Sequence, residues 1–173
     1  MENPAIKNGV FMGIGSILFT MILYLIDSSM IFGGVAYAGF LIMIYFMWKS
    51  ATEEKANNDD FMTFGEGFKA ALLAAVIGGL MAQLFSYLLI NFIDPSLIDV
   101  LREQSIEATE KVIAMFGDNE EAVESMREAM EDQDFTPTIG STLLTYLGTL
   151  IFPTSVIALI IAAITKKIDK SFA

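Results

Sequence analysis

Cysteine and histidine are both absent from the 173-residue sequence. Their absence excludes disulfides, thiol chemistry, zinc held by these side chains and acid–base catalysis by imidazole. Basic residues are few, since ten Lys and Arg accompany 21 Asp and Glu, for a net charge of −11. Because no basic patch can neutralise phosphates, nucleic acid is not an expected partner. We expect no enzymatic activity, no cofactor and no metal site.

Hydrophobic residues, by contrast, make up 54% of the chain. A soluble domain of this size cannot bury so much apolar surface, whereas a bilayer does not require it to be buried. The apolar residues form blocks of about the 20 residues that a helix needs to cross a membrane. The predicted fold class is all-α, a polytopic membrane protein whose first partner is the lipid bilayer. The predicted spans cover about 6–26, 31–48, 68–93 and 139–164.

The positions of lysine and arginine predict how these spans are oriented. Four crossings put both termini and the 49–69 loop on the same side of the membrane. That side carries seven of the ten basic residues, and the other carries Arg102, Lys111 and Arg127. Because basic residues near span ends stay in the cytoplasm, both termini are predicted to be cytoplasmic.

The polar segment 94–138 is strongly acidic. It holds thirteen acidic residues against three basic ones, a balance of −10. Its apolar residues have helical spacing in two stretches, with Gly117 able to end the first and the second covering about 120–131. We predict a helical hairpin over 95–136, outside the membrane, with an apolar seam and an acidic outer surface. On its first helix the predicted seam consists of Ile98, Leu101, Ala108, Val112 and Met115.

Small residues repeat every four positions along the third block, at Ala70, Ala74, Gly78 and Ala82. Gly9 and Gly13 give the first block a shorter version of the same spacing. In lipid, small residues at this spacing let two helix backbones pack closely, and packing drives helix association there. This face can contact another span of the same chain or form the seam of a homodimer, and the spacing allows both.

A carboxamide side chain, Gln83, falls near the middle of the third block. Ser86 and Tyr87 lie on nearly the same helical face. Hydrocarbon offers no hydrogen-bond partner, so a carboxamide at this depth must find one within the protein.

A partner for Gln83 is available in the fourth block. Pro153 lies near its middle and cannot donate the helical hydrogen bond, which frees the carbonyl of Thr149. Thr145 and Thr149 approach this point with a spacing of four residues. We predict that Gln83 faces the fourth span near this kink and helps to satisfy it. The pair is either a structural hydrogen bond or a functional polar site or hinge.

The loop before the third block has the spacing of a capping box. Glu66 follows Thr63 by three residues and can reach back to it. Lys69, one turn later, can extend its amino group to the lipid headgroups. Together these residues predict an interfacial anchor that starts the third span.

A weak internal repeat links the first and third blocks. The stretch "LFTMILYLIDSS" resembles "LFSYLLINFIDPS", which has one residue more, and both finish in Asp then Ser. Two tandem hairpins of the same orientation give this pattern, although apolar helices also imitate one another by composition.

Four segments resemble the domain-of-unknown-function 4199 family. They are "NPAIKNG", "FMTFGEGFKAAL", "YLLINFIDPSL" and "EDQDFTP". Members of that family are small four-helix membrane proteins of certain Gram-negative bacteria. The resemblance implies a multi-pass protein of the bacterial inner membrane. Together with the orientation predicted from the basic residues, this places segment 94–138 in the periplasm. The resemblance implies no activity and supplies no catalytic residues.

Two functions from different classes fit these features. The first is an accessory or scaffold protein that packs through its small-residue faces and presents the acidic hairpin to a membrane-protein partner or a second copy. The alternative is a small-solute transporter with a polar site near Gln83, Thr149 and Pro153. A cavity that reaches Gln83 favours transport, and a fully packed bundle favours the scaffold.

Overall fold

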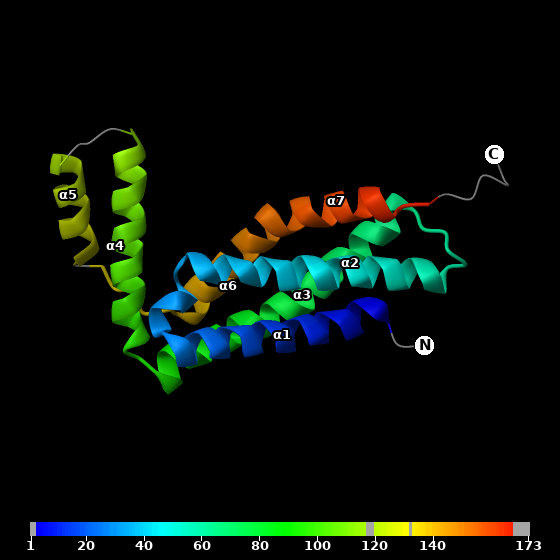
Figure 1. The fold of residues 1–173 in the computed structure, drawn as a ribbon, viewed down its shortest axis with the longest axis horizontal. Helices are drawn as coiled ribbons and strands as arrows, with labels where there is room; N and C mark the ends of the chain where they lie inside the picture. The colour runs from blue at the N-terminus through cyan, green and yellow to red at the C-terminus, as the bar shows by residue number, and fades with distance from the viewer. Residues whose placement is uncertain (1–2, 117–119, 132, 168–173) are drawn as a thin grey trace.

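The computed structural model describes residues 3–116, 120–131 and 133–167, and its regular elements are helices (Figure 1). In these ranges the β-type pairing is confined to one isolated bridge between Met62 and Lys167. The elements in chain order are α1 (Pro4–Ile26), η1 (Ser28–Ile31), η2 (Gly34–Ala38), α2 (Gly39–Asn57), α3 (Phe64–Leu88), η3 (Leu89–Ile93), α4 (Leu97–Phe116), α5 (Glu120–Glu131), α6 (Ile139–Thr149), η4 (Leu150–Thr154) and α7 (Ser155–Thr165).

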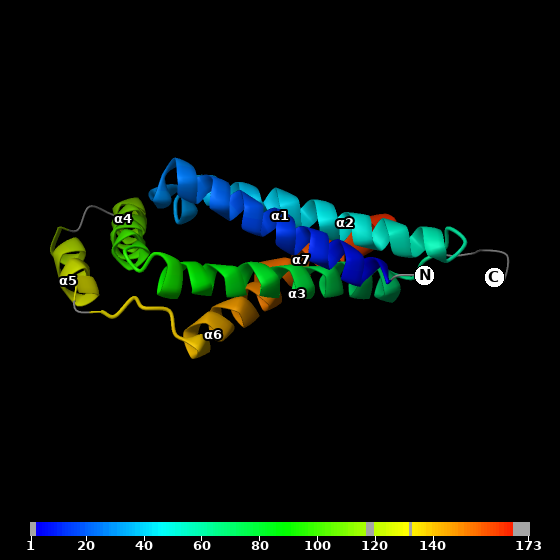
Figure 2. The ribbon, with the colours of Figure 1, turned by 90° about the horizontal axis from the view of Figure 1, so that it is seen from below.

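Four stretches of the described chain are long and apolar enough to cross a membrane, as predicted. They are Pro4–Ile26, Gly34–Asn57, Phe64–Ile93 and Ile139–Thr165. The start of α1, the α2–α3 connection and the end of α7 lie at one end of this bundle, while η1, α4 and α5 lie at the other (Figure 1). α6 leans away from α1 and α2 and contacts α3 (Figure 2).

The crossing of α1 and α3 uses the small residues of both helices. A Cβ atom added to Gly78 would lie 2.7 Å from the carbonyl oxygen of Gly9. A Cβ atom on Gly9 would in turn lie 2.9 Å from the carbonyl oxygen of Ala74, and one on Gly13 would lie 2.7 Å from the sulfur of Met81. The glycines therefore serve a contact within the chain, and α1 covers the face that a homodimer seam would need.

The second span departs from its predicted boundaries of 31–48 at both ends. Residues 28–38 form 3₁₀ turns, and α2 then continues to Asn57, eight residues beyond Lys49. The continuation is held by the bundle, because Glu53 accepts a hydrogen bond of 2.9 Å from the buried Asn8 amide and pairs with Lys7 at 2.7 Å. Residues 50–57, which the sequence analysis placed in the 49–69 loop, are therefore helical.

The third span begins at Phe64, four residues before the predicted position. Thr63 caps it, with a hydrogen bond of 3.3 Å from the Glu66 N–H to the Thr63 hydroxyl. The Glu66 carboxylate accepts a bond of 2.7 Å from the Thr63 N–H in return. This reciprocal pair explains the earlier start. The side chain of Lys69 is exposed one turn later.

The two stretches of the internal repeat end in the same local structure. The Asp27 carboxylate accepts a hydrogen bond from the Ser29 N–H at 2.8 Å, and the Asp94 carboxylate accepts one from the Ser96 N–H at 3.1 Å. The extra residue of the second stretch falls within Leu89–Ile93, which is a π-helical turn. A π turn absorbs one additional residue without ending the helix.

A hydrogen bond joins the ends of these two stretches. The Tyr24 hydroxyl donates to the Asp94 carboxylate at 2.9 Å. The Ser96 hydroxyl and this Tyr24 hydroxyl both stabilise the charged carboxylate, which holds the pKa of Asp94 below its usual value.

α4 and α5 lie side by side beyond the end of the bundle (Figure 1). Arg127 of α5 pairs with Glu110 of α4 at 2.7 Å. The outer half of the predicted apolar seam is not covered, because Val112 is 52% exposed and Met115 is 82% exposed. The Arg127–Glu110 ion pair, rather than this outer half of the seam, therefore joins α4 to α5. The predicted helix end at Gly117 lies outside the described residues.

The substitution Gly78→Ala tests the α1–α3 crossing. The new methyl group overlaps the Gly9 carbonyl, and we expect it to lower the free energy of unfolding in detergent by about 1–3 kcal/mol, the usual cost of overpacking. Gly148→Ala is the matched control, because a Cβ there meets nothing within 4 Å. The midpoint of unfolding by sodium dodecyl sulfate measures both. Equal midpoints for the two variants would contradict the crossing.

Candidate functional site

Three neighbouring cavities that share lining residues lie around α3 and α6. The inner cavity has a volume of about 340 Å³ and lies between α1, α2, α3 and the fourth span. The outer cavity, of about 780 Å³, shares Thr20, Ile31 and Gln83 with the inner one and is bordered by residues 133–138. The lateral groove, of about 360 Å³, runs between α3 and α6. Each volume is in the usual range for a small-molecule site.

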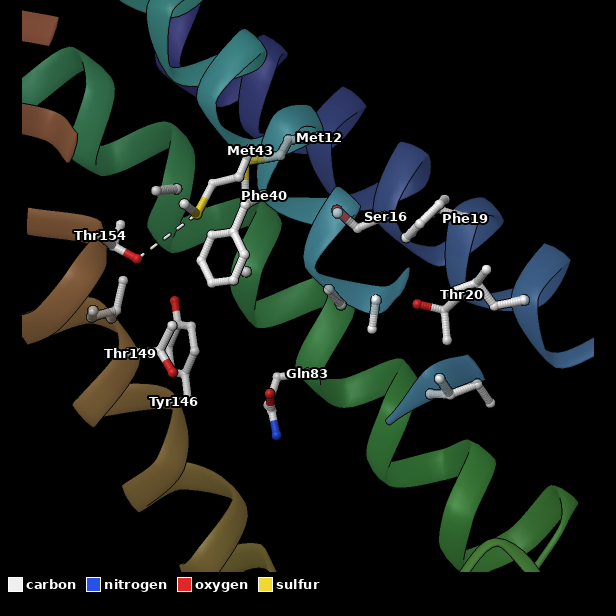
Figure 3. Close-up of a pocket in the computed structure, with 18 residues that line it drawn as sticks. Met12, Ser16, Phe19, Thr20, Phe40, Met43, Gln83, Tyr146, Thr149 and Thr154 are labelled. Atoms are coloured by element: carbon white, nitrogen blue, oxygen red, sulfur yellow. Dashed lines mark hydrogen bonds between the residues drawn. The ribbon is translucent and has the colours of Figure 1, made fainter. Parts of the chain in front are cut away.

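Gln83 borders all three cavities. It projects from α3 into the space between α1 and α6, with Tyr146 and Thr149 on one side and Thr20 on the other (Figure 3). Its amide makes no hydrogen bond with any residue that the structure describes, and its side chain is half-buried. A carboxamide in this position retains its donors and its acceptor for water or a ligand.

The predicted hydrogen bond between Gln83 and the kink of the fourth span does not form. The span breaks at Phe152, whose backbone is extended with φ −150° and ψ 122°, and the peptide bond to Pro153 is cis. The hydroxyl of Ser155 bonds to the carbonyl of Leu150 at 2.6 Å. The Ser155 N–H bonds to the same carbonyl, so these bonds involve Leu150 and not the Thr149 carbonyl that was the predicted partner of Gln83. Gln83 faces the fourth span across the inner cavity.

The other predicted polar residues divide between the cavities. Thr149 borders the inner cavity, and its hydroxyl donates to the Thr145 carbonyl at 3.0 Å. Ser86, Tyr87 and Thr145 border the outer cavity. Pro153 lines none of the three, and acts on their shape by interrupting the helix.

The residues predicted for helix packing and anchoring lie mostly elsewhere. Ala82 is the exception, since it lines the inner cavity although its spacing predicted a helix contact. The carbonyl of Ala70 accepts a hydrogen bond of 2.8 Å from the buried Ser50 hydroxyl, which ties α2 to α3. Thr63 and Glu66 cap the far end of α3.

Tyr146 is the site residue that the sequence analysis missed. Only 8% of it is exposed, and its hydroxyl donates to the carbonyl of Val76 on α3 at 2.5 Å. Its ring lies over Gly79, where an added Cβ would approach the ring to 3.1 Å. The sequence signal was the second glycine of the Gly78-Gly79 pair, which leaves room for a large side chain beside α3.

The cavities carry little charge. Their described lining contains no Lys or Arg, and Asp134 of the outer cavity is its one acidic residue. The hydroxyl and the N–H of Thr136 bond to Asp134 and keep its pKa below the usual value, so the carboxylate is ionised at neutral pH. Nearby, Arg102 lies 5.8 Å from the ring centre of Phe135. Hydroxyl and amide groups therefore dominate the polar part of the lining.

The substitution Tyr146→Phe tests how α6 is held. It removes one interhelical hydrogen bond and keeps the ring, and we expect a loss of about 0.6–2 kcal/mol in unfolding free energy, as for other such bonds in membranes. Tyr37→Phe is the control, because Tyr37 is exposed and makes no hydrogen bond with a described residue. Unfolding in detergent measures both. A loss no greater than that of the control would show that the bond does not hold α6.

Comparisons with known proteins place the chain in a family. Neither the curated proteins nor the solved structures gave a match. One family model matches residues 7–167, and its description is "Protein of unknown function (DUF4199)". This match covers nearly the whole chain and includes all the cavity-lining residues. The chain therefore belongs to the DUF4199 family.

Proposed function

We propose that this protein binds a small molecule in the cavities around Gln83 and acts as a transporter or binding protein of the bacterial inner membrane. The observation that carries the proposal is the Gln83 amide, which borders all three cavities and has no partner among the described residues. A side chain kept only for packing would have a protein partner at this depth.

The backbone beside the cavity supports this proposal. Irregular backbone at membrane depth is tolerated where it is buried in protein or lines a water-filled space. The break at Phe152 is such a place, and its neighbours Leu150 and Thr154 both line the inner cavity. Transporters commonly form their sites from interrupted helices near the middle of the membrane.

The orientation of the cavity follows from the distribution of charge. We propose that the termini are cytoplasmic, because seven basic residues fall on that side against three on the other. Segment 94–138 is then periplasmic, and the outer cavity, which Asp134 and Thr136 border, opens toward the periplasm.

The accessory role remains a second proposal with a different observation behind it. Val112 and Met115 form an exposed apolar patch on α4, within an otherwise acidic segment. Such a patch is suited to a protein contact. The small-residue face of α3 supports the accessory role less than the sequence suggested, because α1 occupies it.

Single cysteines test whether water reaches Gln83. The natural chain has no cysteine, so Gln83→Cys carries the only thiol. We expect a membrane-impermeant methanethiosulfonate reagent, added on the periplasmic side, to label it at least about a hundredfold faster than a thiol in hydrocarbon, since only the thiolate reacts. Modification rates in right-side-out vesicles give the measurement.

Leu18→Cys is the matched control for this labelling. Leu18 is exposed on α1, borders none of the three cavities and corresponds to Leu84 in the internal repeat, so it has a similar depth. Equal rates at Gln83→Cys and Leu18→Cys would mean that the cavity is dry, and would reject the proposal. Labelling from the cytoplasmic side alone would reject the proposed orientation.

A further inference from the structure

We infer that the ligand is a single-chain amphiphile with an uncharged, hydrogen-bonding head group. Its head occupies the cavities at Gln83, and its hydrocarbon chain lies in the lateral groove between α3 and α6. The inference rests on the proposed function and names the class of molecule that the same site binds.

The lateral groove has the chemistry of an acyl-chain site. Leu80, Leu84 and Leu88 line it from α3, and Ile139 and Leu143 line it from α6. All five side chains are partly exposed, so the groove opens on the outer surface of the bundle. At the depth of membrane-spanning helices that surface faces lipid, and a hydrocarbon chain can enter sideways without crossing water.

The groove and the outer cavity are separated only by side chains that line both. Gln83, Tyr87 and Thr142 border both the groove and the outer cavity. A molecule that lies in the groove therefore reaches hydroxyl and amide groups at one end. A small polar solute would use the inner and outer cavities but would leave the groove empty, whereas an amphiphile fills both.

The lining also selects the charge of the head group. No Lys or Arg borders the three cavities in the described chain, while Asp134 is ionised at the outer one. The nearest cation, Arg102, already pairs with Asp99 at 3.3 Å and interacts with Asp134, so an anionic head would be desolvated and would compete with two carboxylates for it. Ser86, Thr142 and Thr145 offer hydroxyl groups to a head that both donates and accepts hydrogen bonds.

Native mass spectrometry of the full chain in detergent tests this inference. The purified protein is equilibrated with 1-monopalmitoylglycerol or with palmitate. These two molecules have the same hydrocarbon chain and differ in the charge of the head group. We expect monopalmitoylglycerol to be retained at least about tenfold more than palmitate at pH 7.4, a difference of about 1.4 kcal/mol. Equal retention of the two would overturn the proposed head-group selection.

Variants that fill the lateral groove test where the hydrocarbon chain of the ligand lies. Leu143→Trp places a larger side chain in the groove, and we expect about tenfold weaker retention of monopalmitoylglycerol, again about 1.4 kcal/mol. Leu144→Trp is the control, because Leu144 is the adjacent residue, is 73% exposed and does not line the groove. Leu84→Trp fills the same groove from α3 and should match Leu143→Trp. Equal retention by the groove and control variants would overturn the inference.

Two further outcomes separate this inference from the proposed function. If Gln83→Cys is labelled but no amphiphile is retained, the inference fails while a small-solute site stands. If the spectra show a dimer that Leu143→Trp dissociates, with no bound amphiphile, a second copy occupies the groove and the inference is overturned. Circular dichroism of each variant confirms that its helices are intact before retention is compared.

Discussion

The close contact between the backbones of α1 and α3 determines the geometry of the bundle. Lipid supplies no hydrophobic force between helices, so tight packing must hold them together. Gly9 and Gly78 allow this close packing near the start of α1, where a Cβ added to Gly78 would lie 2.7 Å from the Gly9 carbonyl oxygen. Toward α4 the two helices diverge (Figure 2). The inner cavity lies between the diverging parts of α1 and α3. The long Tyr24 side chain of α1 bridges this separation and donates its hydrogen bond to Asp94.

The broken fourth span completes the cavities. α7 is packed against α3 and α2, with Ala158 and Ala162 fully buried. α6, beyond the break, has Tyr146 as its only buried residue in the described structure. A helix held at one hydrogen-bonded tyrosine leaves space on both of its sides, which become the inner cavity and the lateral groove.

The features that the sequence predicted depend on local patterns. Span length and the four-residue spacing from Ala70 to Gly78 are properties of one helix, and each specifies a surface. The features that the sequence did not predict depend on which helices contact one another in the folded bundle. The extension of α2 requires Glu53 to reach Lys7 and Asn8 on α1. The position of Gln83 predicted a polar side chain facing the fourth span, but whether its amide meets a carbonyl or a cavity depends on the distance to α6, which no spacing encodes.

The irregular turns of the membrane-spanning helices lie beside the cavities. One extra residue rotates a helix by about 100°, so the π turn at Leu89–Ile93 changes which side chains follow Gln83 on its face. At Leu150–Thr154 the helix is interrupted instead, because the backbone of Phe152 is extended, and this break separates α6 from α7. Regular helices pack more simply in lipid and leave no backbone group unsatisfied. Two departures from regularity therefore lie around one amide that has no partner among the described residues, which is the arrangement that the proposed ligand site would need.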